Sequence, residues 1–347
     1  MHIPHSRPTF GKAFEHAANT LIQSGFLAQG SQTKVLEHSI QSFLQQRHVL
    51  AVDSGTSALM LAIRCLTQHK THARVGIPSY ACASLLFAVK AAGAQPIFMD
   101  CDASLCLEKE QALKTAKTLD VLVLVHPFGM VEPLVEEDFT CPVIEDIAQS
   151  VGATLHGKAA GTFGDLSIGS LYATKPWGGA YGGFITSQDL TLIETIKPMS
   201  NPDHADIHQV YAGHHQLSDL HAVIAIERLK VAESTQTQRQ HWAYMYDKLL
   251  KNASATIIGA QPNTTSNYFR YIIRVDSHAA DIIKKFQTFG IDASHPILKP
   301  LHLSEESHVC PQASQAWQNC VSLPMLADMN QKEFEHMQYG IEQCLYA

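Results

Sequence analysis

Three features are scarce or missing in this sequence of 347 residues, and each absence excludes a class of protein. The formal charge of −7 leaves no basic excess, so nucleic acid is not expected as the main partner. No apolar run approaches the roughly 20 residues that cross a bilayer, and the N-terminal stretch lacks the apolar core of a secretory signal. The eight cysteines form no CxxC pair. We therefore expect a cytoplasmic protein with reduced thiols and no membrane contact.

Metal and dinucleotide motifs are missing as well. Among the 20 histidines the best metal candidate is the pair His204 and His208, which lacks the glutamate of HExxH and an obvious third ligand. No GxGxxG follows the first predicted strand, which argues against a Rossmann-type dehydrogenase. We expect no metal site.

What the sequence does contain is an alternation of short apolar runs and helical segments between about residues 50 and 190. The run 121–125 is apolar at every position, as expected for a strand that is buried on both faces. This alternation predicts parallel strands with helical crossovers, and therefore an α/β layered domain. Ligands of such sheets bind beyond the carboxyl ends of the strands. The predicted strands are 48–52, 74–78, 95–100, 120–125 and 141–146, with helices at 56–69 and 83–94.

A long helical pattern at 217–250 separates this region from a smaller one. Beyond it, 267–275 alternates as a strand does, 279–290 is a helix closed by Gly290, and 331–345 is a final amphipathic helix. The sequence therefore predicts a large domain at 1–240, which includes the N-terminal segment, and a small C-terminal α+β domain at 241–347.

A candidate anion site lies where the first predicted strand enters Ser54, Gly55, Thr56 and Ser57 before a helix. Glycine allows close backbone approach, the hydroxyls donate, and the helix N-terminus supplies free N–H groups, which together suit a phosphate. An ordinary helix N-cap accounts for the same residues, so both interpretations stay open.

Two further strand-end groups suggest a cofactor. Asp146 ends a buried strand, where a carboxylate is costly without a cationic partner, and Gln149 follows one turn later. Lys175 is the only charged residue between Asp165 and Asp189, and a desolvated lysine can attack a carbonyl. A phosphate cup, a carboxylate and a Schiff-base lysine are what pyridoxal phosphate requires, with Ser170 as a further hydroxyl for the anion.

These residues occur in motifs that resemble one family along nearly the whole chain. "SGTSAL" resembles its phosphate loop, and "IPSYACASLLFAVKAAGAQPIFMDCD" resembles its "PSYTF…NAV…GA.PVFVD" block. "IEDIAQSVGA", "SLYATK", "LSDLHAVIAIERL" and "HPILKPLHL" follow in the family's order and spacing. The family is that of the DegT/StrS-type nucleotide-sugar aminotransferases, which are pyridoxal phosphate enzymes of fold type I.

The resemblance implies a role for each residue that matches a family motif. Lys175 would form the internal aldimine and move the proton between the donor Cα and the cofactor C4′. Asp146 would pair with the pyridine nitrogen, Gln149 would contact the phenolic oxygen, and Ser170 with the loop at 55–56 would hold the phosphate. The implied activity is ping-pong transfer of an amino group from glutamate (or glutamine) to a keto sugar, a nucleotide-linked 4-keto-6-deoxy sugar, through pyridoxamine phosphate. The family's setting is polysaccharide biosynthesis.

The family also implies a homodimer with shared active sites, in which His214 would reach the neighbouring subunit's cofactor. This chain departs from the family near the cofactor. Cys82 stands where an aromatic residue stacks on the ring, and Pro176, Tyr181, His214 and Gln216 replace Asn, Glu, Asn and Arg. The candidate substrate contacts are Tyr181, His295 and Lys299.

Three alternatives remain beside this hypothesis. A sugar dehydratase of the same fold would carry histidine at the position of the intact Lys175. A catalytically altered or silent member that binds pyridoxal phosphate would account for the changed cofactor surroundings. An enzyme of the same cofactor that acts on a non-nucleotide keto substrate is the third.

Overall fold

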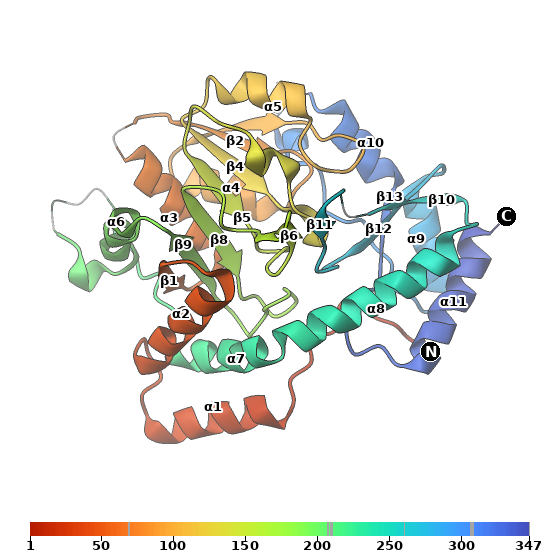
Figure 1. The fold of residues 1–347 in the computed structure, drawn as a ribbon, viewed down its shortest axis with the longest axis horizontal. Coiled ribbons are helices and arrows are strands. Elements are labelled where there is room, and N and C mark those ends of the chain that lie inside the picture. Colours follow the sequence, from red (N-terminus) through yellow and green to blue (C-terminus); the bar gives the residue numbers. More distant parts are fainter. Residues whose placement is uncertain (69, 207, 209–210, 260, 306–308, 347) are drawn as a thin grey trace.

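The computed structural model describes residues 1–68, 70–206, 208, 211–259, 261–305 and 309–346, and its largest element is a seven-stranded sheet (Figure 1). The five strands expected between residues 48 and 146 are confirmed within one or two residues at each end. In spatial order the strands are β1 (His48–Val52), β9 (Gly183–Ser187), β8 (Leu166–Ser170), β5 (Val143–Asp146), β4 (Val121–Val125), β2 (Arg74–Pro78) and β3 (Gln95–Met99).

The sheet is mostly parallel, as predicted, with one strand reversed. β9 runs antiparallel to both of its neighbours, β1 and β8, whereas the pairs from β8 to β3 are parallel. The parallel strands β2, β4, β5 and β8 therefore end at the same edge, which is where ligands of such sheets bind.

Helices cover both faces of the large sheet, which explains why its strands are apolar at every position. In β4, Val121 and Val123 pack with α3 and α4 on one face, whereas Leu122 packs with α5 on the other. The helices of this part are α1 (Lys12–Ser24), α2 (Ser31–Leu44), α3 (Gly55–Thr67), α4 (Ala83–Ala91), α5 (Lys109–Ala116) and α6 (Leu190–Ser200).

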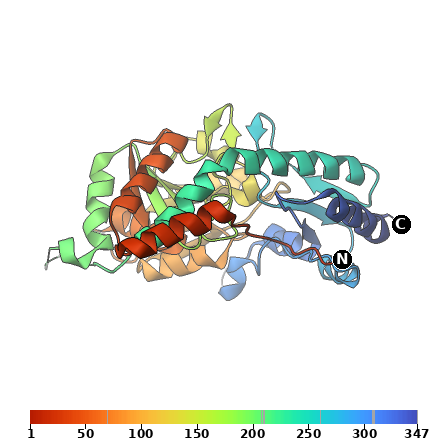
Figure 2. The ribbon, with the colours of Figure 1, turned by 90° about the horizontal axis from the view of Figure 1, so that it is seen from below.

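The long helical pattern predicted at 217–250 folds as two helices. α7 (Asp219–Lys230) and α8 (Ala232–Leu250) meet at Val231, whose backbone leaves the helical conformation (φ −111°, ψ 8°). α8 runs from the large sheet to the C-terminal part of the molecule (Figures 1 and 2). Its Ala232 belongs to the core cluster beside α2 and α7, and its Tyr246 belongs to the C-terminal cluster.

The C-terminal part is a small α+β layer. Its antiparallel sheet has the order β10 (Ala255–Ile258), β12 (Tyr271–Val275) and β13 (Cys320–Leu323), and it packs against α9 (Ala279–Thr288), α10 (Pro311–Asn319) and α11 (Gln331–Leu345). A third, small sheet is formed by β11 (Thr264–Thr265), β6 (Thr154–Leu155) and β7 (Lys158–Ala159). Short 3₁₀ turns lie at Pro127–Gly129, Pro133–Glu136, Pro202–His204 and Leu301–Ser304.

The N-terminal segment joins the C-terminal core. Ile3 is fully buried there, and its backbone bridges that of Ile291. Figure 2 shows both chain ends on this side of the molecule. The boundary predicted near residue 240 falls inside α8 and stays a prediction. Among the described residues, no helix combines the length and apolar character needed to cross a membrane.

Close packing in the middle of the sheet generates a stability prediction. A Cβ at Gly169 of β8 would lie 2.1 Å from Cζ of Phe184, which is fully buried in β9 and has no room to move. We expect Gly169→Ala to lower the free energy of unfolding by about 1–3 kcal/mol, measured by urea denaturation. Gly259→Ala, where a Cβ meets nothing within 4 Å, is the matched control. Adding Phe184→Leu to Gly169→Ala should recover part of the loss, and equal midpoints for the two alanine variants would refute the packing argument.

Candidate active site

The loop between β1 and α3 presents a helix N-terminus at the edge of the sheet. Ser54 caps α3 because its Oγ accepts a hydrogen bond from Ser57 N (3.1 Å), while its carbonyl accepts one from Ala58 N (2.9 Å). Of the first turn, this leaves the amides of Gly55 and Thr56 free of partners in the described part of the chain. A Cβ at Gly55 would come within 3.0 Å of Ser170 Cβ, so glycine lets the helix start approach the end of β8.

The end of β5 contributes a buried carboxylate. Asp146 Oδ1 accepts a hydrogen bond from Ala148 N (2.9 Å), and burial raises the pKa of this carboxyl despite the opposing charge of Lys175. Gln149 Oε1 accepts from Phe128 N (2.9 Å), which leaves its Nε2 to donate elsewhere. Phe128 itself has a positive φ of 58°, so this hydrogen bond holds an uncommon backbone conformation in place.

Next to Asp146, Glu145 and His126 form a fully buried pair. His126 Nε2 lies 2.9 Å from Glu145 Oε2, and its Nδ1 accepts from Glu132 N (3.1 Å). Because Nδ1 is an acceptor, the proton sits on Nε2 and is donated to the Glu145 carboxylate. His126 therefore has a structural role. Its partner Glu145 lies on the face of β5 opposite to that of Asp146, which lines the cavity.

Glu145 also ties down the turn that precedes β8. Its carboxylate accepts hydrogen bonds from the amides of Gly161 (2.8 Å), Phe163 (2.7 Å) and Gly164 (2.7 Å). Burial alone would raise the pKa of Glu145, but the hydrogen bonds from His126 and from these amides lower it below its usual value.

Lys175 lies in the turn that follows β8. Its backbone N–H donates to Tyr172 O (2.8 Å) and its carbonyl accepts from Gly178 N (2.8 Å), so the chain folds back tightly around it. Burial lowers the pKa of the Lys175 amine, and the charge of Asp146 opposes this shift. The Nζ atom lies 5.0 Å from the centre of the Phe269 ring. These surroundings favour the uncharged, nucleophilic amine.

These groups line one cavity of about 220 Å³ beyond the carboxyl ends of β5 and β8. Its wall contains most of the residues singled out from the sequence, from the helix start, the strand ends and the turns after them: Gly55, Thr56, Cys82, Asp146, Gln149, Ser170, Lys175 and Tyr181. The structure confirms that Ser54 caps α3, and the anion site at the same turn stays a prediction.

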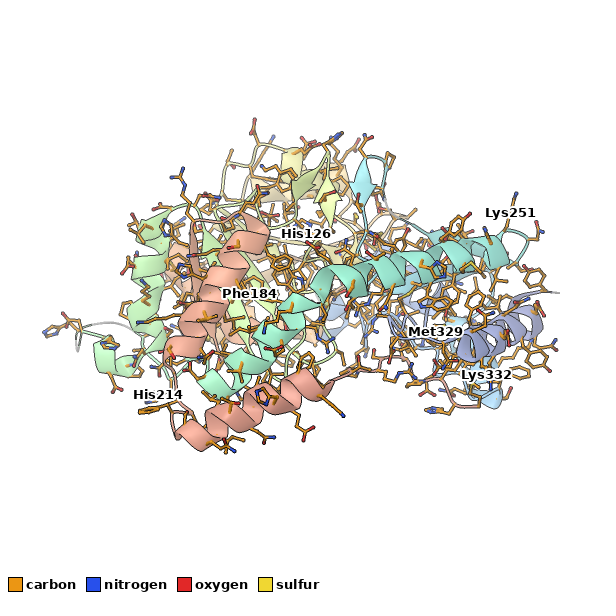
Figure 3. All side chains as sticks on the ribbon, turned by 60° about the horizontal axis from the view of Figure 1, so that its bottom comes forward. His126, Phe184, His214, Lys251, Met329 and Lys332 are labelled. Atoms are coloured by element: carbon orange, nitrogen blue, oxygen red, sulfur yellow. The ribbon has the colours of Figure 1, made fainter. Side chains whose placement is uncertain are left out.

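Three predicted residues lie away from this cavity. His214 is exposed on the end of the molecule opposite Lys251 (Figure 3), and Lys299 is exposed as well. His295 stacks on Trp317 with ring centres 4.8 Å apart, and burial lowers its pKa. Their proposed contacts with cofactor or substrate stay predictions. In the described ranges, no group of three or more His, Cys, Asp or Glu is arranged to hold a metal ion.

Sequence reasoning did not identify Ser84 and Tyr172 as parts of the cavity wall. Tyr172 packs edge to face against Tyr181, with ring centres 5.4 Å apart, at the mouth of the cavity. Ser84 lies two residues after Cys82, and this proximity in the sequence could have indicated that it lines the same cavity. No sequence signal marked the arginines on the other side of Lys175, which are described below.

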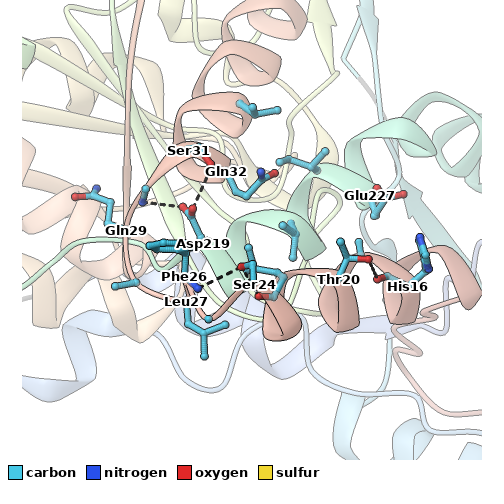
Figure 4. Close-up of a pocket in the computed structure, with 18 of the residues that line it drawn as sticks. His16, Thr20, Ser24, Phe26, Leu27, Gln29, Ser31, Gln32, Asp219 and Glu227 are labelled. Atoms are coloured by element: carbon cyan, nitrogen blue, oxygen red, sulfur yellow. Dashed lines mark hydrogen bonds between the residues drawn. The ribbon is translucent and has the colours of Figure 1, made fainter.

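A larger groove of about 1010 Å³ lies outside the site, between α1, α2 and α7 (Figure 4). Asp219 closes one end of it, where its carboxylate caps α2 through the amides of Gly30, Gln32 and Thr33. Phe26, on the rim, is 80% exposed.

Comparison with known proteins places nearly the whole chain in one family. A sequence profile of the DegT/DnrJ/EryC1/StrS aminotransferase family matches residues 8–341. The UDP-N-acetyl-3-dehydro-alpha-D-glucosamine 3-aminotransferase of Acidithiobacillus ferrooxidans is 25% identical, over 91% of this chain and 89% of its own length. The GDP-perosamine synthase of Caulobacter vibrioides is 23% identical, over 89% of each chain.

The fold agrees with solved structures. PseC of Helicobacter pylori, an aminotransferase involved in the biosynthesis of pseudoaminic acid, superposes with a TM-score of 0.90 at 20% identity over 98% of both chains. The predicted fold, a large domain with a mostly parallel sheet and a smaller C-terminal α+β part, is confirmed.

The buried Glu145 generates a pH-dependent prediction. Its pKa is lower in the folded protein than the unfolded value of about 4.5, so its stabilising effect is complete above that pH and is lost as the pH falls through the folded value. We expect Glu145→Gln to lower the free energy of unfolding by about 2–4 kcal/mol at pH 7, and by less below pH 4.5, in urea titrations. Glu15→Gln, at an exposed position, is the control. A loss that grows on acidification would contradict the assigned ionisation.

Proposed function

The chain belongs to the DegT/DnrJ/EryC1/StrS aminotransferase family and is therefore an aminotransferase; from this premise we propose that it moves an amino group from glutamate or glutamine to a nucleotide-linked keto sugar, with pyridoxal phosphate as cofactor. The observation that carries the proposal is that Lys175, Asp146 and the first turn of α3 line the same cavity. The sugar acceptor is supported by the two relatives, which are named for a UDP-linked 3-keto sugar and for GDP-perosamine.

The residues of the cavity fit pyridoxal phosphate. The amides of Gly55 and Thr56, with the Ser170 hydroxyl, provide donors for the phosphate at a helix N-terminus. The buried Asp146 carboxyl gains a cationic partner when the pyridine nitrogen is protonated, which favours its ionised form. Gln149 retains Nε2 as a donor for the phenolic oxygen, since Oε1 is engaged by Phe128 N.

Lys175 supplies the nucleophile and the proton carrier. Pyridoxal phosphate, when bound, supplies an electron sink that stabilises negative charge developing at the donor Cα. Burial lowers the pKa of Lys175, which favours the uncharged amine, and this amine would hold the cofactor and would carry the proton that leaves the donor Cα. Tyr172 and Tyr181 stand at the mouth, where the acceptor sugar would enter.

A homodimer with shared active sites is part of the same proposal. His214 is exposed and lies outside the cavity of its own chain, as a residue that serves a neighbouring subunit would. The segment that carries it is anchored to the phosphate loop, because Asp53 N donates to His215 O (2.9 Å) and His215 Nδ1 lies 3.3 Å from Asp53 Oδ2.

The first test is the donor half-reaction. Glutamate should convert the visible absorption of the bound cofactor in the wild type, and Lys175→Ala should slow this conversion by about 10²- to 10⁴-fold, because it removes the proton carrier. Lys251→Ala, on the far side of the C-terminal part (Figure 3), is the matched control and should react as the wild type does. Conversion by Lys175→Ala at the wild-type rate would refute the assigned role.

The second half-reaction identifies the acceptor. The aminated enzyme is offered 4-keto-6-deoxy and 3-keto hexoses, each with and without a nucleoside diphosphate, and the return of the visible absorption is scored. Return only with the nucleotide-linked sugars supports the proposal, and return with free keto compounds points to a non-nucleotide substrate. No conversion by any amino acid would favour the silent cofactor-binding protein.

Subunit complementation tests the shared site. Lys175→Ala and His214→Ala chains, each impaired alone, are expressed together with different tags and the mixed dimers are isolated. If His214 acts on the neighbouring cofactor, a mixed dimer carries one intact site and should recover about half of the wild-type activity. Absence of recovery would place both residues in one chain's site, and full activity of His214→Ala alone would remove it from the site.

A further inference from the structure

A second, smaller cavity adjoins the candidate active site on the other side of Lys175. It measures about 70 Å³, enough for a group of a few atoms, and Lys175 lines both cavities. Its remaining wall is formed by the N-terminal segment at 6–9, the start of β12 and the loop after β13. Four guanidinium groups line it, those of Arg7, Arg228, Arg239 and Arg270.

Two of these arginines already have strong partners. Arg7 pairs with Asp328 (3.0 Å) and with Glu333 (2.6 Å). Arg228 donates to the carbonyl oxygens of Gly178 (3.0 Å) and Thr9 (2.6 Å). Arg7 is therefore neutralised by two carboxylates, and Arg228 is held by two backbone carbonyl groups.

The other two arginines have few hydrogen-bond acceptors among the described residues. Arg270 donates from Nη1 to Ser6 Oγ (2.7 Å) and stacks on Phe269, with its guanidinium carbon 4.4 Å from the ring centre. Arg239 makes no hydrogen bond to any other described residue, although its Nε is fully buried. A guanidinium has five donors, and leaving them buried without acceptors is costly.

The charges around this cavity repel one another. Burial and the neighbouring Arg228 lower the pKa of Arg239 to about 10, and burial and Arg239 lower the pKa of Arg270 to about 10. The charge of Arg270 also contributes to lowering the pKa of Lys175. A bound anion would relieve this repulsion, and a carboxylate is the planar, bidentate partner that guanidinium groups match.

The position of the cavity indicates which carboxylate it takes. The donor Cα must approach Lys175 Nζ for proton transfer, and the α-carboxylate of an amino acid is one bond from that carbon. We propose that Arg239 and Arg270 bind the α-carboxylate of the amino donor in this second cavity. The proposal rests on the proposed function, and it makes these arginines the residues that select an amino acid as the donor. A nucleoside diphosphate exceeds the size of the cavity.

The test measures binding of glutarate, a dicarboxylate without an amino group, to the holoenzyme by titration calorimetry. Arg239→Met and Arg270→Met should each weaken glutarate binding by about 10- to 100-fold, because a hydrogen-bonded charge partner is lost. Arg239→Lys keeps the charge but loses the paired N–H donors of the guanidinium. Its glutarate affinity should fall between those of the wild type and Arg239→Met. The exposed Arg47→Met is the matched control and should bind as the wild type does.

The visible absorption of the bound cofactor and the thermal unfolding midpoint report whether each variant is folded. Wild-type glutarate affinity in both folded methionine variants overturns the proposal. Binding of inorganic phosphate at these arginines that glutarate does not displace overturns it as well. A wild type that binds glutarate through Arg239 but converts no amino acid counts against the proposed function, and not against carboxylate binding by these arginines.

Discussion

The constraint on which the structure depends is the burial of a lysine amine and a carboxylate at one edge of a parallel sheet. Lys175 and Asp146 shift each other's ionisation, and desolvation drives each toward its neutral form. Neither group stabilises the fold by itself, since a weakly paired buried ion is costly. Their retention is understandable when a ligand supplies what each lacks, an electrophilic carbon for the amine and a cation for the carboxylate.

The scaffold holds these two groups through a second carboxylate. Glu145 faces away from the cavity on the strand that carries Asp146, and its bonds to His126 and to the turn before β8 fix β5 relative to β8. Since β8 carries Ser170 and leads into Lys175, one buried ion network sets the spacing between the acid, the phosphate donors and the amine. Glu145 and Asp146 are consecutive residues of β5, so one points to the structural face of the sheet and the other to the cavity.

The sequence predicts the site from two signals, apolar strands that end in polar residues and the isolated charge of Lys175. β1, β4 and β5 have strong apolar patterns, so the sequence identifies Gly55 and Asp146 as strand-end residues. β8 and β9 were not predicted, because serine, threonine and glycine interrupt their apolar runs, where Gly169 makes room for Phe184. The break at Val231 was also missed, since the helical period continues across it without glycine or proline.

The arginine cavity could not be predicted, because its wall is assembled from distant segments. Ser6 accepts from Arg270 and Thr9 accepts from Arg228, while Ile3 is anchored in the C-terminal core. The N-terminal segment therefore links the C-terminal layer to α7, and its residues 6–9 form part of the cavity wall beside Lys175. No local pattern signals such a contact between the two ends of a chain. The amine's surroundings thus depend on chain-end packing as much as on the sheet, and movement of the C-terminal layer would alter the charge around Lys175 directly.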